Sequence, residues 1–387
     1  MQPTIASKLP AVGTTIFTVM SQLATETGAI NLSQGYPSFD PPEELTDRIS
    51  YYLQHGANQY APMPGVPSLR RAIADKVAML YNRHVNADTE VTVCDGATEG
   101  LFSAIQAVVR PGDEVIVFDP AYDSYEPSVT LAGGRTTHMP LISTEHKPEF
   151  HIDWERLEDA ISERTRLIIL NFPHNPTGVI LTAEDLETLA SVVRDTGIYL
   201  LSDEVYEHIV FDGAAHESLL KHDNLWERTF VISSFGKTYH ATGWKVGYCI
   251  APPLLTTEFR KIHQWVCYTV ITPIQHALAD YMVKTPEHYQ ELPAFYQNKR
   301  DHFCELVKDS RFSLRPAQGT FFQILDYSAI TDENDEAYAR RLTREIGVAS
   351  IPISVFSEHP PDSHLLRFCF AKDDDILEEA AERLCRL

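Results

Sequence analysis

The sequence predicts an α/β protein, with a large domain built on a mostly parallel sheet of seven strands and a smaller α+β domain. Three observations predict this fold class. Short apolar runs alternate with helical patterns from about residue 91 to residue 251. Several runs are apolar on consecutive residues, which is typical of parallel strands covered on both faces. After about residue 275 a long helical stretch precedes a group of short strands.

The strands of the large sheet are expected at seven apolar runs, which are residues 91–93, 114–118, 135–141, 167–170, 198–201, 230–233 and 246–251. Between them, residues 184–194 carry an apolar stripe at helical spacing, with Thr182 as a suitable N-cap. A second helix is expected over residues 99–109, before Pro111 and Gly112. Strands that alternate with helices indicate crossover connections, and therefore a parallel sheet.

The C-terminal part is expected to begin with a helical stretch that runs to Lys308 and is interrupted at Pro286 and Pro293. Strands are expected at residues 312–315, 320–326, 348–353 and 365–371, and helices near residues 335–346 and 374–386. The N-terminal residues contain scattered turn formers. We therefore expect residues 1–40 to form an arm and part of the small domain, residues 41–275 the large domain, and residues 276–387 the small domain.

The charge of the chain excludes two classes of partner. There are 32 basic and 54 acidic residues among 387, which gives a net charge of −22. A phosphate backbone is bound by clustered lysines and arginines, so no nucleic-acid partner is expected. The same charge argues against docking on an anionic membrane surface. No apolar run approaches the roughly 20 residues of a membrane span, so no membrane partner is expected.

The cysteines point to a reducing compartment. Six cysteines are spread widely along the chain, and none forms a CxxC pair. In a chain of this size, free thiols are expected rather than disulfides. No histidine or cysteine cluster has the spacing of a zinc site, so no metal is expected. The N-terminal segment is interrupted by Pro10 and Gly13, unlike a signal peptide. These features predict a cytoplasmic location.

Residues 233–245 (SSFGKTYHATGWK) form the most informative loop, because they place Lys237 and Lys245 eight residues apart directly after an apolar strand. A lysine is costly to bury unless its amine is needed there. Two lysines in one compact loop indicate one amine for covalent chemistry and one for holding a phosphate. A pyridoxal phosphate site requires that combination, so the loop predicts this cofactor.

Other unusual loops also follow predicted strands directly, and they are residues 94–98, 119–122, 171–178 and 203–206. If the sheet is parallel, these loops share one edge, where ligands of such sheets bind. Gly96, Ala97 and Thr98 precede the helix expected from Glu99, whose free N-terminal N–H groups favour an anion, although an ordinary helix with Thr98 near its cap is the alternative. Asp203 could pair with a protonated pyridine nitrogen, or form a salt bridge or helix cap. Tyr206 could donate to a ring hydroxyl or be a core tyrosine.

A loop with two asparagines, a tyrosine and an arginine each allow a functional and a purely structural interpretation. Asn171 and Asn175 bracket Pro173 in a rigid turn, which could hold an amide against the cofactor or serve only as a turn. Tyr122 could stack on a flat ring or pack in the core. Arg367 lies in an otherwise apolar run and could bind a substrate carboxylate or a structural acidic partner.

Five motifs occur in order along the chain: residues 175–178 (NPTG), 203–206 (DEVY), 234–237 (SFGK), 242–247 (TGWKVG) and 367–370 (RFCF). Together they resemble the class I pyridoxal-phosphate aminotransferases of fold type I, over essentially the full chain. Residues 31–37 (NLSQGYP) and 56–62 (GANQYAP) are similar to the kynurenine/glutamine aminotransferase branch. Residues 233–240 (SSFGKTYH) and 173–176 (PHNP) resemble the bacterial methionine aminotransferases within it.

The resemblance implies roles for the site residues. The implied cofactor contacts are Lys237 (covalent attachment and proton transfer), Asp203 (pyridine nitrogen), Asn175 and Tyr206 (ring hydroxyl), Tyr122 with Asn171 nearby (ring face), and Ala97, Thr98, Ser234 and Lys245 (phosphate). Tyr60 would reach the phosphate of the neighbouring subunit, which implies a homodimer with active sites shared across the interface. The implied substrate contacts are Arg367, Asn175 and Gly35 (carboxylate), and Phe17 and Tyr36 (side chain).

The resemblance also implies the reaction, which is ping-pong transamination between an L-amino acid and a 2-oxo acid. Residues 270–273 (VITP) replace the aromatic or histidine positions of the branch, which favours methionine or another apolar or aromatic donor over kynurenine. Kynurenine/glutamine transamination and a cysteine-conjugate or cystathionine-type β-lyase stay as alternatives. A transcription regulator on the same fold is disfavoured by the charge and by the absence of an added DNA-binding segment. A catalytically dead homologue is disfavoured because every cofactor position is chemically competent.

Overall fold

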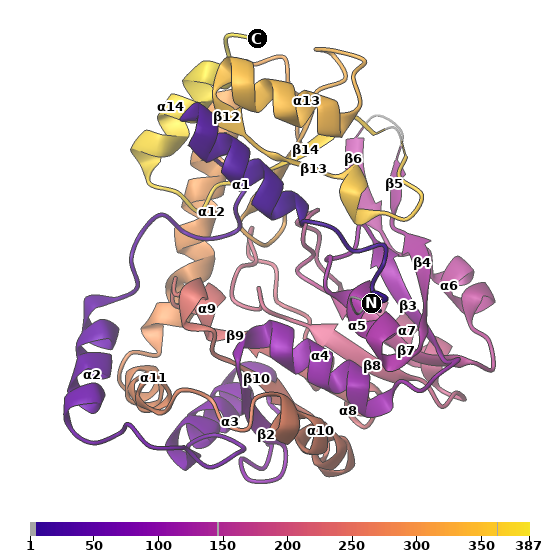
Figure 1. Ribbon diagram of the computed structural model, residues 1–387, viewed down its shortest axis with the longest axis vertical. Helices are drawn as coiled ribbons and strands as arrows, with labels where there is room; N and C mark the ends of the chain where they lie inside the picture. Colours follow the sequence, from indigo (N-terminus) through magenta and orange to yellow (C-terminus); the bar gives the residue numbers. More distant parts are fainter. Residues whose placement is uncertain (1–4, 145–146, 362) are drawn as a thin grey trace, which may run out of the picture.

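The computed structural model describes residues 5–144, 147–361 and 363–387. A seven-stranded sheet forms its centre (Figure 1), in the order β2 (Val91–Cys94), β10 (Gly247–Ile250), β9 (Thr229–Ser234), β8 (Tyr199–Asp203), β7 (Thr165–Asn171), β3 (Glu114–Asp119) and β4 (Arg135–Pro140). Strand β10 is antiparallel to both of its neighbours, and the other pairs are parallel. The predicted mostly parallel sheet of seven strands is therefore confirmed.

Helices cover both faces of this sheet. Its helical elements and turns are α2 (Glu43–Gln54), α3 (Pro67–Tyr81), α4 (Gly96–Val108), α5 (Tyr125–Ala132), α6 (Trp154–Ala160), α7 (Ala183–Val193), η1 (Leu219–Lys221), α8 (Asp223–Trp226), α9 (Phe235–Thr238), η2 (Thr242–Trp244), α10 (Pro253–Val266) and α11 (Thr272–Lys284). In β3, Val115 and Val117 pack with α4 and α10, whereas Ile116 and Phe118 pack with α7. This burial on both faces explains why the strands are apolar on consecutive residues.

Two predicted helices are present with their expected signals. Helix α7 begins after Thr182, and Thr182 and Asp185 form a reciprocal capping box. Helix α4 begins at Gly96, three residues before the expected start, because Asp95 takes the N-cap position. Ala97 and Thr98 therefore belong to the first turn of this helix.

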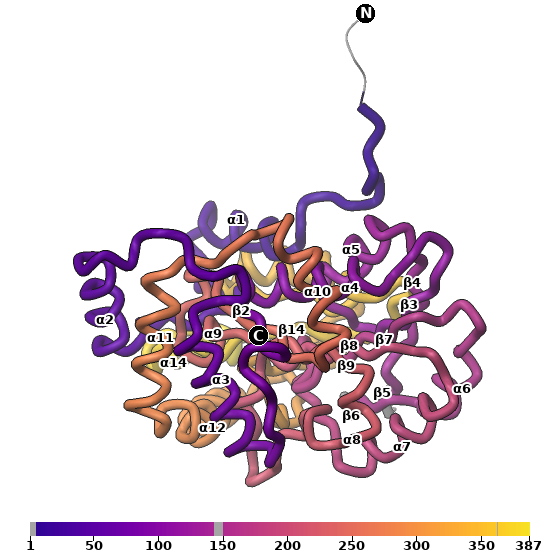
Figure 2. Tube along the Cα trace, turned by 90° about the horizontal axis from the view of Figure 1, so that it is seen from below, coloured from indigo at the N-terminus to yellow at the C-terminus, as the bar shows by residue number. Residues whose placement is uncertain are grey.

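The C-terminal part has its own core. It contains α12 (Glu287–Val307), β11 (Phe322–Asp326), α13 (Asp335–Arg341), the π-helical turn η3 (Leu342–Ile346), β12 (Val348–Ala349), β13 (Ile351–Pro352), η4 (Ser354–Phe356), β14 (Leu365–Cys369) and α14 (Asp374–Leu384). Helix α1 (Ile16–Thr27) lies near the top of Figure 1 and packs on η3, β12 and β13, and β1 (Ile30–Asn31) pairs with β12. The described residues before α1, which begin at residue 5, extend away from the body (Figure 2).

Three local expectations were wrong. Residues 312–315 form no strand, because only Ser313 makes an isolated bridge, to Asp326. Residues 348–353 are divided between two sheets, since β12 pairs with β1 and β13 pairs with β14. Pro293 does not interrupt α12, which continues through it. A proline inside a helix costs about 3 kcal/mol, and α12 offsets this by burying one long face that includes Tyr296 and Phe303.

The short hairpin of β5 (Ile142–Thr144) and β6 (Lys147–His151) was not expected from the sequence. The expected domain boundary at residue 275 falls inside α11, which packs on α2 and α3. We propose a boundary between α11 and α12 instead, because α12 packs on α14. Within the described ranges, no helix is long and apolar enough to cross a membrane.

Candidate active site

A cavity of about 300 Å³ opens at the edge of the sheet where the parallel strands end. All of the predicted site residues except Tyr36 and Tyr60 line it, namely Phe17, Gly35, Ala97, Thr98, Tyr122, Asn171, Asn175, Asp203, Tyr206, Ser234, Lys237, Lys245 and Arg367. Cavities of this size hold small ligands and cofactors. The predicted convergence of the strand-end loops is therefore present in the structure.

The strand register explains why distant loops meet here. Asn171 lies opposite Asp203 at the ends of β7 and β8. Ser234, the last residue of β9, lies opposite Gly247, the first residue of β10. Since β10 runs antiparallel to β9, the residues that precede β10 reach the same edge as those that follow β9. Lys245 therefore joins Lys237 although it stands before a strand rather than after one.

Lys237 lies in α9, and its side chain lines the cavity. Its Nζ donates a 2.9 Å hydrogen bond to the carbonyl oxygen of Gly35. Burial lowers the pKa of Lys237 to about 8, and the charges of Arg367 and Lys245 lower it as well. A larger fraction of this amine is neutral near neutral pH than in a free lysine, which suits a nucleophile or a proton acceptor.

Asp203 ends β8 and is buried. Its Oδ2 accepts a 2.6 Å hydrogen bond from the hydroxyl of Tyr125, and its Oδ1 lies 3.4 Å from the backbone N–H of Val205. Burial raises the pKa of Asp203 to about 6, whereas the two hydrogen bonds and the charge of Lys237 oppose this rise. Neither hydrogen-bond partner carries a positive charge, so the carboxylate is suited to accept a cationic ligand group.

Arg367 is held in β14 with its guanidinium beside the cavity. Nη1 donates to Asn175 Oδ1 at 2.8 Å, and Nη2 donates to the carbonyl of Ser33 at 2.8 Å. Nε has no hydrogen-bond partner among the described residues, and no described carboxylate forms an ion pair with this side chain. The guanidinium lies 3.9 Å from the ring centroid of Phe322, and burial lowers the pKa of Arg367 to about 10. The charge of Asp123 raises the pKa of Arg367, but among the described residues Asp123 forms neither a hydrogen bond nor an ion pair with the guanidinium, which is therefore suited to bind an anionic ligand.

Asn171 connects two of the loops. Its side-chain N–H donates to the carbonyl of Asp203 at 3.1 Å, and its Oδ1 accepts from the backbone N–H of Asn175 at 3.0 Å. Asn175 in turn accepts from Arg367. The rigid turn around Pro173 therefore links the backbone carbonyl of Asp203 to the guanidinium of Arg367 through two amides.

The first turn of α4 forms an anion cradle together with Ser234 and Lys245. A helix N-terminus presents free N–H groups and the positive end of the helix dipole. Gly96 has a φ of +71°, and a Cβ there would lie 3.2 Å from the Nζ of Lys245. A Cβ on Gly247 would lie 3.0 Å from the backbone nitrogen of Ala97. Glycine at both positions therefore lets the lysine and the helix start approach one ligand.

Aromatic side chains close the cavity. Burial raises the pKa of Tyr122 to about 12, and burial also raises the pKa of Tyr206 well above its usual value. Tyr206 packs edge to face on Phe321 at 5.1 Å. Both phenols therefore stay protonated at neutral pH and can donate hydrogen bonds.

Two predicted residues lie outside the cavity. Tyr36 is 46% exposed and Tyr60 is 80% exposed. Tyr60 contacts Tyr268 edge to face at 5.4 Å. The role implied for Tyr60 requires a second subunit, and it stays a prediction.

Sequence reasoning missed three residues that the structure brings to the site. Gln34 and Phe322 line the cavity, and Tyr125 contacts Asp203. Gln34 stands next to Gly35, and Tyr125 stands one helical turn after Tyr122. Spacing from a predicted site residue could have indicated these two. Phe322 gave no signal, because an apolar residue in a strand reads as core.

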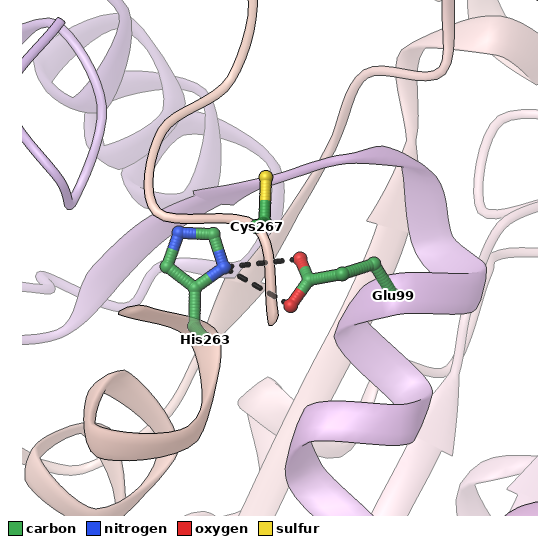
Figure 3. A group of neighbouring side chains, drawn as sticks. All are labelled: Glu99, His263 and Cys267. Carbon is green, nitrogen blue, oxygen red and sulfur yellow. Dashed lines mark hydrogen bonds and ion pairs between the residues drawn. The ribbon is translucent and has the colours of Figure 1, made fainter. Parts of the chain in front are cut away.

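Glu99, His263 and Cys267 form a polar group beside α4, and their donor atoms lie within 4.8 Å of one another (Figure 3). His263 Nδ1 lies 3.0 Å from both carboxylate oxygens of Glu99, and Nε2 lies 3.3 Å from the carbonyl of Met63. Glu99 also accepts from Ser103 at 2.6 Å. We interpret this group as a link that holds α10 against the first turn of α4.

The comparisons with known proteins agree with this architecture. The family described as aminotransferase class I and II matches residues 27–384, and the chain belongs to this family. A methionine aminotransferase of Escherichia coli is 50% identical over 381 residues, 98% of each chain. The crystal structure of an Escherichia coli protein with a methionine aminotransferase function has 50% identity and a TM-score of 0.97, and covers 100% of both chains. A kynurenine–oxoglutarate transaminase of Dictyostelium discoideum is 35% identical over 410 residues, 97% of this chain and 94% of its own.

The chain is therefore an aminotransferase, and its family uses pyridoxal phosphate. The residues of the cavity fit that cofactor. An amine of lowered pKa, a buried carboxylate and a helix N-terminus with a nearby lysine supply partners for an aldehyde carbon, a pyridine nitrogen and a phosphate respectively. Arg367 Nε keeps a free donor beside these groups, since it has no hydrogen-bond partner among the described residues.

Proposed function

We propose that this aminotransferase uses L-methionine, or another amino acid with an apolar side chain, as its preferred amino donor. The observation that carries the proposal is the lining of the cavity. Lys237, Lys245 and Arg367 are the basic residues among the described ones that line it. Lys237 is assigned to the cofactor carbon, Lys245 to the phosphate and Arg367 to the α-carboxylate of the substrate. None of them is free to bind the additional side-chain carboxylate of an acidic donor such as aspartate. Phe17 and Phe322 flank Arg367 at 5.2 Å and 3.9 Å, which favours an apolar side chain beside the carboxylate site.

The proposed tasks of the residues follow from their chemistry. Pyridoxal phosphate, when bound, supplies a carbon that takes the amino group and a ring that withdraws electrons from the substrate Cα. Lys237 holds the cofactor and then moves the proton at the substrate Cα, as its lowered pKa permits. Asp203 favours the protonated pyridine nitrogen. Asn175 and Tyr206 orient the ring hydroxyl, and Tyr122 covers the ring face.

The substrate is oriented by a separate set of groups. Arg367 binds the α-carboxylate, with Asn175 fixing the guanidinium at 2.8 Å. The backbone of Gly35 lies close to the ring of Phe322. A side chain at this position would not fit, because a Cβ there would lie 2.8 Å from that ring. Phe17, which lines the cavity, is proposed to contact the donor side chain, whereas the same role for Tyr36 stays a prediction because Tyr36 lies outside the cavity.

A donor panel tests the proposal. Purified holoenzyme is mixed with methionine, kynurenine, glutamine or aspartate, and the loss of the visible absorption of the cofactor gives a rate for each donor. We expect methionine to react at least about ten times faster than aspartate, since a second carboxylate without a partner costs more than about 1.4 kcal/mol. Pyruvate release from a β-substituted cysteine is measured in parallel. Faster reaction with aspartate, or β-elimination faster than transfer, would refute the proposal.

We infer that the active unit is a homodimer with shared active sites. Tyr60 is 80% exposed and contacts Tyr268, which is 52% exposed, and Leu254 and Trp265 of α10 are each 83% exposed, so large apolar side chains are available for contact with a partner subunit. The extended residues before α1 offer a second region for contact with a partner subunit (Figure 2). In this proposal Tyr60 reaches the phosphate held by the partner.

Mixed dimers test the shared site. Lys237→Ala and Tyr60→Ala chains with different tags are co-expressed, and the mixed dimer is purified. If sites are shared, the mixed dimer has one intact site and exceeds both parent dimers in activity. Activity no higher than the mean of the parents would contradict sharing. A monomer in sedimentation would contradict the dimer itself.

We also propose a cytoplasmic location. All six cysteines are free, which suits a reducing compartment. Fractionation of cells that express the tagged protein checks this, and recovery with oxidised cysteines outside the cytoplasm would contradict it.

A further inference from the structure

Tyr125 has a contact that the proposed function does not use. It is the first residue of α5 and is 3% exposed. Its hydroxyl donates a 2.6 Å hydrogen bond to Asp203 Oδ2. This distance is typical of a charge-assisted O–H···O⁻ hydrogen bond, which is about twice as strong as a neutral one. Tyr125 is not among the described residues that line the active-site cavity, so it acts on the site through Asp203.

The two oxygens of Asp203 have different surroundings. Oδ2 is held by the phenol, whereas the contact of Oδ1 is a backbone N–H at 3.4 Å. A distance of 3.4 Å makes a weak hydrogen bond. Oδ1 therefore keeps most of its capacity to accept a hydrogen bond from a ligand. The orientation of the carboxylate depends mainly on Tyr125.

Tyr125 is itself fixed by the loop that supplies Tyr122. Its backbone N–H donates to the carbonyl of Tyr122 at 3.2 Å, and the two rings meet edge to face at 5.7 Å. Ala121, which precedes Tyr122, donates through its backbone N–H to the carbonyl of Phe356 at 2.7 Å. The ring-stacking tyrosine and the partner of Asp203 are therefore carried by one rigid segment.

The charges around Asp203 make this hydrogen bond important. Burial raises the pKa of Asp203, and the hydrogen bond from Tyr125 is the largest effect that lowers it. The other groups that act on this pKa are the backbone of Val205 and Lys237, which lower it, and Glu204, which raises it. Burial and the carboxylate of Asp203 raise the pKa of Tyr125 well above 10, so its phenol stays protonated and remains a donor.

We propose that Tyr125 is a positioning residue for Asp203: its hydroxyl fixes one carboxylate oxygen and favours the ionised form, which leaves the other oxygen for the pyridine nitrogen. The inference rests on the role of Asp203 in the proposed function. It deepens that function, because it assigns the ionisation of Asp203 to a residue outside the cavity. Without the phenol, Asp203 would be neutral over part of the working pH range and would no longer stabilise a protonated ring nitrogen.

The test compares Tyr125→Phe with Tyr338→Phe. Tyr338 is also fully buried, but its hydroxyl has no hydrogen-bond partner among the described residues. Carboxyl carbon NMR on apo-protein labelled at aspartate follows the titration of Asp203, which is assigned with Asp203→Asn. A hydrogen bond to a charged group contributes about 1.5–3 kcal/mol, so Tyr125→Phe should raise the titration midpoint of Asp203 by about one to two pH units. Tyr338→Phe should leave it unchanged.

The holoenzyme gives a second readout. In Tyr125→Phe, kcat should fall about tenfold at pH 6 and less than about twofold at pH 9, with the KM for methionine changed less than twofold. An unchanged Asp203 midpoint in Tyr125→Phe, or a loss of activity equal at all pH values, would overturn the inference. Full activity in Asp203→Asn would instead overturn the role proposed for Asp203 itself. The melting temperatures of both Phe variants show whether each is folded.

Discussion

The two sides of the active-site cavity are built in different ways. The cofactor side, defined here as Ala97, Thr98, Tyr122, Asn171, Asp203, Ser234, Lys237 and Lys245, comes from loops at one edge of one sheet. The carboxylate side, defined as Phe17, Gly35, Asn175, Phe322 and Arg367, is assembled from segments far apart in the chain. Arg367 donates to the carbonyl of Ser33, 334 residues away.

Under the proposed function, this difference separates the residues of the catalytic chemistry from those that select the substrate. The geometry of the cofactor side follows from strand register, which is fixed by the buried sheet. The carboxylate side depends on the packing of the N-terminal segment on β14. Lys237 connects the two sides through its hydrogen bond to Gly35. Substitutions on the cofactor side should therefore change kcat or cofactor affinity, and those on the carboxylate side should change the KM of the donor.

The largest effect is expected at Lys237. In Lys237→Arg the guanidinium cannot give up a proton near neutral pH, so it can neither hold the cofactor covalently nor accept a proton. Turnover should fall by about four orders of magnitude, as measured with saturating methionine and pyridoxal phosphate. The melting temperature reports whether the fold survives. Turnover within tenfold of the wild type would show that the cofactor side works differently.

The pH dependence of stability gives the next largest effect. The pKa of Lys237 is about 8 in the folded chain and 10.5 as a reference. Between these values the unfolded state binds more protons, so stability rises with pH in this window. The difference of 2.5 units corresponds to about 3 kcal/mol. Urea unfolding of apo-protein should show this rise from pH 8 to 10.5, and Lys237→Met should lack it. Parallel curves for both proteins would contradict the lowered pKa.

Substitution of Arg367 should affect donor binding on the carboxylate side. Arg367→Lys keeps the charge but loses the planar, two-pronged contact with a carboxylate. The KM for methionine should rise about ten- to hundredfold, with a smaller change in kcat. Arg300→Lys is the control, because Arg300 is buried beside Asp212 and Asp301 outside the cavity. A rise in KM for Arg300→Lys as large as for Arg367→Lys would place the effect in stability rather than binding.

The smallest effect is expected at Lys245. Arg there keeps a positive charge near the helix start, so Lys245→Arg should weaken pyridoxal phosphate binding about tenfold and retain activity when cofactor is in excess. Titration of apo-protein with cofactor measures this. Loss as complete as in Lys237→Arg would show that the two lysines do not have separate tasks.

The sequence predicted the cofactor side better than the carboxylate side for a physical reason. A strand followed by a polar loop is a local signal, and parallel strands bring such loops together. The position of Tyr36 could not be predicted, because its exposure depends on how the N-terminal segment lies on the body. Phe322 could not be predicted, because its place beside the cavity is a tertiary contact, whereas Tyr125 had only its spacing from Tyr122 as a signal.

In the fold, too, elements with a local sequence signal were predicted, whereas features that depend on tertiary packing were not. The sheet of seven strands and the capped helix α7 carry strong periodic signals. The sequence predicts a helix interruption at Pro293, because proline is unfavourable inside a helix. The structure shows that the burial of one face of α12 outweighs this local preference. The split of residues 348–353 between two sheets depends on pairing with β1, which no local pattern records.

The most direct test of the account follows the Cα proton of the donor. L-Methionine is incubated with holoenzyme in D₂O without a 2-oxo acid, and mass spectrometry measures deuterium at Cα in wild type and in Lys237→Ala reconstituted with pyridoxal phosphate. The account predicts rapid incorporation by the wild type and a rate lower by about four orders of magnitude in the variant, because Lys237 moves this proton. Incorporation by Lys237→Ala at a rate close to that of the wild type would contradict it.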